Sequence, residues 1–309
     1  MTVDFIDTIS SDLKIQRRDM IEKDIVLHQV LSDLSKDGFF SGNFVFKGGT
    51  CLIKHYLGYL RFSEDIDFTW KDQSRFGGKS GKRVSKDLSG MIDKSGKVFE
   101  EIAARRGLDF KCHKADRRYV ELGGSNRLCT FKVWYDSAVL KRTTFFKVQM
   151  SFVEEMCVKS KSGRLKSLIS GREEGRIKAL FPDEYGEYSA AIPFQMYDVR
   201  EILSEKIRAI LTRKGVKARD YLDIFFISKK SGIKPRDVEK CAIEKINRST
   251  GLYEKYRDNL GEKKKLLSKG AMFRWGDEKG LVLTELDDEF DRFVLELEKY
   301  LRELLAKLK

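Results

Sequence analysis

Proline and cysteine are both scarce in this chain of 309 residues, and each shortage excludes certain kinds of structure. Only three prolines occur, which argues against long disordered linkers. The five cysteines are odd in number and scattered, with no Cys-x-x-Cys pair, so we expect neither a disulfide framework nor a zinc ribbon. Cys112 and His113 are adjacent, but no nearby residue completes a metal site with them. This cysteine usage predicts a reducing, cytoplasmic environment.

Long apolar segments are also missing. No stretch approaches the roughly 20 apolar residues that a membrane-spanning helix requires. The first residues, MTVDFIDTISSDL, carry early acidic side chains and no apolar core, so no signal peptide is expected. The sequence therefore predicts a cytoplasmic protein without a membrane partner.

Charge, in contrast, is abundant and unbalanced. Charged residues make up 35% of the chain and hydrophobic residues 41%, which permits a sizeable core under a heavily charged surface. The formal net charge of +13 predicts attraction to a polyanion, of which RNA or DNA is the commonest. A basic, solvated surface with no nucleic-acid role is the alternative, and charge alone does not separate the two.

The hydrophobic periodicity changes along the chain and predicts an α/β (mixed α+β) fold in two domains. Residues 1–190 are expected to form a mixed sheet with flanking helices, and residues 191–309 a mostly helical domain. Pro182 and Pro193 are expected to bracket a loop near the boundary. The expected strands are 44–46, 66–70, 128–135 and 144–152, and the expected helices are 11–36, 51–59, 88–107, 199–213, 218–230 and 285–308.

The most informative motif lies between residues 44 and 70 and contains two carboxylates on one predicted strand. Residues i and i+2 of a strand point the same way, so Asp65 and Asp67 can aim at one point where a hard divalent cation could bind. The glycines of Gly48-Gly49-Thr50 would let backbone amides approach a phosphate at a helix start.

The order and spacing of these parts make the motif specific. Glycines after a strand, one short helix and then Asp-x-Asp on the adjacent strand should bring the turn and the carboxylates side by side. Such a pair is the minimum equipment for metal-dependent chemistry on a nucleotide. An acidic edge strand with a glycine cap is the structural alternative.

A second candidate block lies in the helical half. Lys206 shares a predicted helical face with apolar residues, where a lysine is costly unless it meets an anion. We expect the Lys206 ammonium to contact a nucleoside triphosphate. The alternative is that its aliphatic stem lies along the apolar face and its ammonium reaches the surface. Asp220 could orient Lys206, contact metal or substrate, or merely pair with Arg219 or Lys217, whereas Asp223 is expected to be structural.

Together these blocks resemble the AbiEii/AbiGii toxin family, which includes the MenT toxins and belongs to the DNA polymerase β-like nucleotidyltransferase superfamily. The resemblance covers roughly residues 20–230, and nothing beyond a helical tail is named for 231–309. It rests on Glu22-Lys23-Asp24, Phe46-Lys47-Gly48-Gly49-Thr50, Lys54, the segment from Arg61 to Asp67, the segment from Arg200 to Ala209, and the segment from Lys217 to Asp223.

The resemblance implies an enzyme of the nucleotidyltransferase (EC 2.7.7) type that acts as the toxin of a type IV-like toxin–antitoxin system. It would transfer a nucleoside monophosphate from an NTP to RNA, expected at the 3′ end of tRNA, and would have an antitoxin partner. Asp65 and Asp67 would hold Mg²⁺, with Mn²⁺ as an alternative. The helical domain of residues 191–309 would complete the active-site cleft, and its Lys206 and Asp220 would complete the catalytic set. Gly48, Gly49, Thr50, Ser63 and Lys206 would bind the nucleotide, with Arg61 assisting, and Lys54 either assists or is solvated.

One position departs from the superfamily pattern. A third carboxylate is often found on a later central strand, but the inward position here is Gln149, with Asp136 and Glu154 as substitutes. Two carboxylates can still hold Mg²⁺ when the triphosphate supplies further oxygens. The alternatives are a nucleotide-binding regulatory module without turnover, transfer to a protein hydroxyl, and a basic nucleic-acid scaffold. The sequence specifies neither the NTP, the acceptor nor the oligomeric state.

Overall fold

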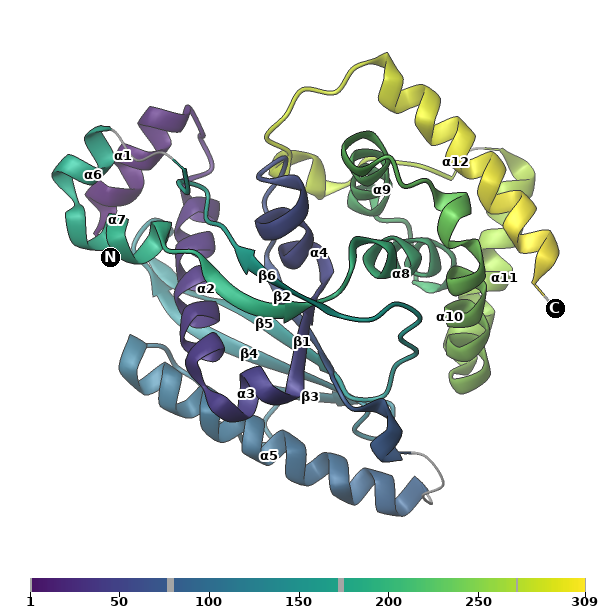
Figure 1. Cartoon of the computed structure of the whole chain (residues 1–309), viewed down its shortest axis with the longest axis horizontal. Coiled ribbons are helices and arrows are strands. Elements are labelled where there is room, and N and C mark those ends of the chain that lie inside the picture. Colours follow the sequence, from purple (N-terminus) through teal and green to yellow (C-terminus); the bar gives the residue numbers. More distant parts are fainter. Residues whose placement is uncertain (1, 77–80, 172–174, 271, 309) are drawn as a thin grey trace. The chain divides into compact units, whose positions relative to one another are not determined.

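The computed structural model describes residues 2–76, 81–171, 175–270 and 272–308 (Figure 1). Its secondary structure is mixed α/β, which confirms the predicted fold class. The chain forms two compact units, one of residues 1–154 with 160–196 and one of residues 155–159 with 197–309. The sequence places the boundary after residue 190, whereas this division falls after Met196 and assigns the short segment 155–159 to the second unit.

Among the described residues, the first unit is built on one sheet of seven strands in the order β3-β4-β5-β2-β1-β7-β6. The sheet is mixed, because β2 runs parallel to β5 and β1 runs parallel to β7, while the other neighbours are antiparallel. The strands are β1 (Phe44–Lys47), β2 (Asp65–Trp70), β3 (Val120–Gly123), β4 (Leu128–Ser137), β5 (Arg142–Ser151), β6 (Lys161–Leu165) and β7 (Ile192–Met196).

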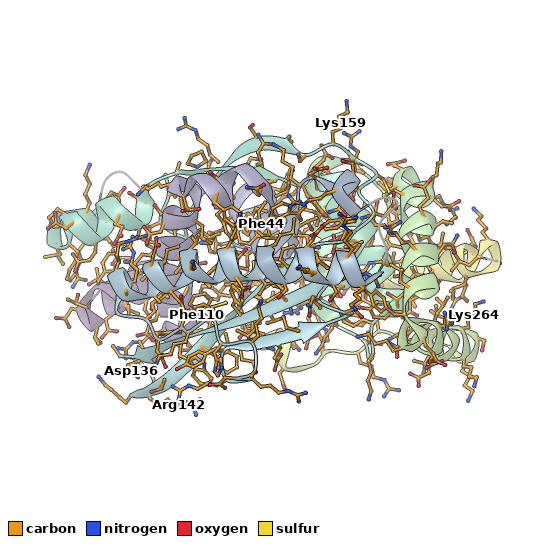
Figure 2. The ribbon with its side chains drawn as sticks, turned by 90° about the horizontal axis from the view of Figure 1, so that it is seen from below. Phe44, Phe110, Asp136, Arg142, Lys159 and Lys264 are labelled. Atoms are coloured by element: carbon orange, nitrogen blue, oxygen red, sulfur yellow. The ribbon has the colours of Figure 1, made fainter. Side chains whose placement is uncertain are left out.

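One face of this sheet is the core of the first unit. The ring of Phe40, on α3 (Gly38–Asn43), lies 4.4 Å from Phe44 of β1 and 4.7 Å from Phe68 of β2. It also lies 5.8 Å from Phe99 of α5 (Gly81–Arg106), so both helices cover the same face. Figure 2 shows α5 crossing in front of the strands on the side where Phe44 is labelled. Because strand side chains alternate, the opposite face is left for polar residues.

The N-terminal region contains two helices where the periodicity predicted one from 11 to 36. Helix α1 (Val3–Leu13) ends at Lys14, whose backbone is left-handed at φ 55°, and α2 (Arg18–Lys36) follows after a short break. The predicted helix was wrong here because a left-handed cap made by lysine gives no glycine signal.

The remaining helices of the first unit include one that lies where the two prolines predicted a loop. Pro182 starts α7 (Pro182–Ser189), where its missing N–H costs nothing, and Pro193 lies inside β7. The predicted loop between the two prolines is therefore wrong. The first unit also contains α4 (Gly48–Cys51), which continues as a wider helical turn to Leu57, and α6 (Arg176–Leu180).

The second unit is helical. The helices predicted at 199–213, 218–230 and 285–308 are present with ends that differ by up to three residues, whereas no range was predicted for the two helices between 231 and 284. Asp198 accepts a hydrogen bond from the Arg200 N–H and caps the first helix. No helix among the described residues is long and apolar enough to cross a membrane. The helices are α8 (Val199–Thr212), α9 (Ala218–Ser231), α10 (Glu239–Leu252), α11 (Glu254–Lys269) and α12 (Asp288–Lys307).

A buried polar network joins α2 to the helical segment after β1. Lys54 is only 2% exposed, and its ammonium lies 2.9 Å from the carboxylate of Asp24, itself 3% exposed. The hydroxyls of Tyr59 and Tyr188 donate to the same carboxylate at 2.7 and 2.6 Å. The alternative of a solvated Lys54 is therefore wrong, and this lysine anchors the segment that begins at the glycine turn.

His28 adds a pH dependence to this network. Its Nε2 lies 2.9 Å from the carbonyl oxygen of Ala190, and the imidazole is fully buried. Burial, reinforced by the nearby Lys54 ammonium, lowers the pKa of His28 from 6.5 to about 3, although Asp24 and the carbonyl act in the opposite direction. Below about pH 6.5, His28 therefore binds a proton in the unfolded chain but stays neutral in the folded chain until the pH approaches 3.

We therefore expect stability to fall as the pH drops from about 6.5 towards 3, by up to about 1.4 kcal/mol per pH unit from this group. Urea denaturation between pH 7 and pH 4 should show a shallower loss for His28→Gln than for the parent. The exposed His113→Gln is the matched control and should retain the parent slope. An unchanged slope in His28→Gln would remove His28 as the source.

Candidate active site

Both aspartates of the Asp-x-Asp motif lie on the polar face of the sheet. In β2, Asp67 is paired with Lys47 of β1 on one side and Gln149 of β5 on the other. Asp65 is paired with Lys147 of β5. Because paired residues of neighbouring strands share a face, the two carboxylates are flanked by two lysines and an amide. Both aspartates are half-buried, so water and a ligand can reach them.

The glycine turn lies directly against these carboxylates. Gly48 follows the residue paired with Asp67 and has φ +77°, a conformation that a side chain rarely adopts. A Cβ atom at Gly48 would lie 2.1 Å from Oδ2 of Asp67. The turn and the carboxylate are therefore neighbours, as the spacing predicted. At Gly49, a Cβ atom would lie 2.8 Å from Nη2 of Arg61 and 3.2 Å from Oγ of Ser63.

Gly48→Ala should be strongly deleterious for both reasons. The left-handed backbone costs an alanine roughly 1–2 kcal/mol, and the methyl group must displace the Asp67 carboxylate. A displacement of about 1 Å can cost roughly 100-fold in rate. Thermal denaturation and nucleotide transfer should both be measured. Gly42→Ala is the matched control, because nothing lies within 4 Å of its added Cβ; equal behaviour of the two variants would contradict the prediction.

Thr50 connects the turn to β2 through its side chain. Its hydroxyl lies 2.8 Å from Oγ of Ser63 and hydrogen-bonds to the backbone carbonyl of Asp65. Thr50 is 1% exposed, so its buried hydroxyl connects the glycine turn to the start of β2. The first turn of a helix leaves its backbone N–H groups without intrahelical partners. Phosphate contacts at Gly48, Gly49 and Thr50 would therefore come from the backbone.

Of the two substitutes for a third carboxylate, the structure brings Glu154 towards the site. Its carboxylate pairs with the ammonium of Lys47 and accepts a hydrogen bond from Thr69 Oγ1 at 3.0 Å. Thr69 lies two residues beyond Asp67 on the same face of β2, roughly 7 Å along the strand. Lys47 stands immediately before the glycines, but no local pattern in the sequence indicates its pairing with the distant Glu154.

Asp136 lies far from the site. Its carboxylate accepts a hydrogen bond from Thr143 at 2.6 Å, near the end of the β4–β5 hairpin. On β4 it is six residues from Thr130, the partner of Gln149, which corresponds to about 20 Å. Figure 2 shows Asp136 beside Arg142 at this end of the strands. Asp136 is therefore wrong as a substitute metal ligand, and Gln149 occupies the position next to Asp67.

In the second unit, the lysine and the aspartates predicted from the sequence do meet. The ammonium of Lys206 lies 2.7 Å from the carboxylates of both Asp220 and Asp223, which are buried. Asp220 also pairs with Arg213 at 3.0 Å, rather than with Arg219 or Lys217. Burial raises the pKa of Asp220, but attraction to Lys206 and Arg213 outweighs it and brings the pKa to about 2. Lys206 is thus held rigidly between two charges.

The glycine turn against an Asp-x-Asp strand accords with a family comparison that spans most of the chain. Residues 29–303 match the family model described as the nucleotidyl transferase AbiEii toxin of a type IV toxin–antitoxin system. The chain belongs to the AbiEii family. The resemblance drawn from the sequence is confirmed, and the AbiEii match extends it through the helical region after residue 230 that the sequence analysis could not name.

Solved structures similar to this AbiEii protein are distant. JHP933 from Helicobacter pylori is 16% identical, with 94% of each chain covered and a TM-score of 0.39. A second H. pylori structure, described as that of a candidate nucleotidyltransferase, is 17% identical, with 92% of this chain and 94% of that chain covered and a TM-score of 0.36. No curated protein matches.

Family membership makes this AbiEii protein a nucleotidyltransferase toxin, with a nucleotide substrate and an antitoxin partner. Its Asp-x-Asp site also fits a hard cation. Carboxylate oxygens are the ligands that Mg²⁺ and Mn²⁺ prefer, and both aspartates share one face of β2. The Asp67 carboxylate can lie against the turn because residue 48 lacks a Cβ atom.

Proposed function

We propose that this AbiEii protein transfers a nucleoside monophosphate from an NTP to an RNA acceptor, in a Mg²⁺-dependent reaction that Mn²⁺ also supports. The observation that carries the proposal is the contact between Gly48 and the Asp67 carboxylate. It places an amide-lined turn next to paired hard ligands, so a triphosphate bound at the turn would have its α-phosphate near the carboxylates.

Each residue of the first unit has a defined part in this proposal. Asp65 and Asp67 would hold the metal ion, which supplies polarisation of the α-phosphate and a lower pKa for the attacking hydroxyl. The N–H groups of Gly48, Gly49 and Thr50 would bind the triphosphate, and Ser63 would keep Thr50 in place.

Lys206 of the helical unit is proposed to neutralise the β- or γ-phosphate, and Asp220 to fix its ammonium. The 2.7 Å pair between them supports the orienting role. The +13 charge supports a polyanionic acceptor, for which we propose the 3′ end of tRNA. Residues 159–178 and 79–86 are the basic stretches proposed to guide it, although 77–80 and 172–174 lie outside the described residues. Modification of that end would stop translation and arrest growth until an antitoxin intervenes.

One observation favours a second function. Gln149 beside Asp67 cannot act as an anionic metal ligand, which suits a module that binds nucleotide without turnover.

Purified protein should be incubated with each of the four α-labelled NTPs, Mg²⁺ and total RNA. Label in RNA supports the proposal, label in protein indicates a hydroxyl acceptor, and tight nucleotide binding without transfer indicates the module. RNA binding without nucleotide affinity would indicate a scaffold and overturn both.

A further inference from the structure

The helical unit contains a second group of metal-ligating side chains, which the Asp-x-Asp chemistry does not use. Cys157, Glu201 and Cys241 offer ligand atoms that all lie within 4.8 Å of one another. Cys157 belongs to the segment 155–159, Glu201 to the first turn of α8 and Cys241 to the first turn of α10. Three segments distant in the sequence therefore meet in one cluster.

Glu244, one turn after Cys241 on α10, supplies a fourth donor. Its Oε2 atom lies 3.5 Å from Sγ of Cys157, and Oε2 of Glu201 lies 3.8 Å from Sγ of Cys241. Zinc bonds of about 2.3 Å to sulfur and 2.0–2.2 Å to oxygen give a tetrahedron with edges of roughly 3.4–3.8 Å. These two sulfur-to-oxygen separations match those edges, and the ligand atoms of Cys157, Glu201 and Cys241 all lie within 4.8 Å of one another, so these three ligands have nearly the spacing that an ion requires.

The carboxylate of Glu201 is fixed in the way that metal-binding carboxylates usually are. It is fully buried, accepts hydrogen bonds from the backbone N–H groups of Cys157 at 3.1 Å and Val158 at 2.9 Å, and pairs with Lys245 at 2.6 Å. Hydrogen-bonded ligands of this kind orient a site before the ion binds. Partial burial of the Cys157 thiol, followed by its hydrogen bond to Cys241, raises the pKa of this thiol, and a bound cation would act in the opposite direction.

We propose that Cys157, Cys241, Glu201 and Glu244 bind one thiophilic divalent cation such as Zn²⁺, which fastens segment 155–159 to α8 and α10. Two sulfur ligands select this class of ion over Mg²⁺, which prefers oxygen. Each thiol loses its proton to solvent as its sulfur binds, so binding of one ion releases two protons. The exposed Cys157 provides the route of entry.

The test uses the full chain carrying Asp67→Asn, so that the Asp-x-Asp site does not obscure the result. The reduced protein is stripped with a chelator and titrated with Co²⁺, then with Zn²⁺. We expect a thiolate-to-cobalt absorption band that saturates at one ion per chain, and its loss when Zn²⁺ displaces Co²⁺. Zn²⁺ should also raise the thermal denaturation midpoint.

Cys157→Ser should weaken Co²⁺ binding by about 100-fold or more and remove the Zn²⁺-dependent rise in the midpoint, and Glu244→Gln should weaken binding about tenfold. Because Cys157 is exposed, its serine variant should fold, which circular dichroism can verify. Cys112→Ser, in the first unit, is the matched control and should bind Co²⁺ like its parent.

Three outcomes would overturn the proposal. The first is a cobalt spectrum without a thiolate band, and the second is Cys157→Ser binding as tightly as the parent. The third is a Cys157–Cys241 disulfide in the isolated protein that, once reduced, yields no metal binding. None of these outcomes bears on nucleotide transfer, which is measured separately on the unaltered chain.

Discussion

Asp67→Asn should abolish nucleotide transfer while the protein remains folded. The substitution keeps the size of the side chain but removes the negative charge next to Gly48. Metal ions stabilise a transition state of this kind by several kcal/mol, and each 1.36 kcal/mol is tenfold in rate, so we expect a fall of roughly 1000-fold or more. Label transfer from NTP to RNA and Mn²⁺ binding followed by electron paramagnetic resonance should both be lost. Asp65→Asn should behave in the same way.

Asp72→Asn is the matched control, because this exposed aspartate lies two residues beyond β2 and accepts hydrogen bonds from Ser74 in the turn that follows. It should keep full activity and Mn²⁺ binding. An Asp67→Asn enzyme with more than a tenth of parental activity would rule out metal catalysis at this strand. Toxicity in cells should follow the same order, with growth arrest by the parent and by Asp72→Asn only.

Asp24→Asn should cause the largest loss of stability. The substitution leaves the ammonium of Lys54 buried beside a neutral amide, and removing one partner of a buried pair costs about 3–5 kcal/mol. Because Lys54 lies in the helical segment that begins at Gly48, activity should fall as well. Urea denaturation at pH 7 gives the free energy of unfolding.

A double-mutant cycle separates the pair from other effects of the substitution. Lys54→Met in the Asp24→Asn background removes the unpaired charge and should restore more than half of the lost stability. Lys54→Met alone completes the cycle, and the two substitutions together should cost less than the sum of their separate effects. Asp12→Asn, at an exposed position of α1, should change stability by less than about 0.5 kcal/mol. Strictly additive effects of the two substitutions would contradict a direct ion pair.

The sequence was sufficient where a short-range pattern determined the structure. Alternation predicted β4 and β5 as strands, and the spacing between Gly48 and Asp67 predicted their contact. The sequence was not sufficient where contacts between segments distant in the chain determined the structure. The burial of Lys54 depends on contacts with α2 and Tyr188, which no local pattern predicts. The end of α1 at Lys14 was also not predicted, because the usual glycine is missing there.

The same contrast applies to the candidate sites. Residues 65 and 67 are two apart on one strand, so the sequence displays their common direction. Cys157, Glu201 and Cys241 come from three elements and have no characteristic spacing, so the scattered cysteines predicted no metal site. The role of Lys47 with Glu154 was hidden for the same reason, because the two are 107 residues apart.

Residues 155–159 belong to the helical unit, although the chain on both sides of them belongs to the sheet unit. The polypeptide therefore passes from one unit to the other three times. A protease that cuts once near residue 196 would leave a sheet fragment that also carries residues 155–159 and a helical fragment that lacks them. Biochemical work on isolated halves would require a split protein reassembled from both pieces, or a rearranged chain order that returns these five residues to the helices.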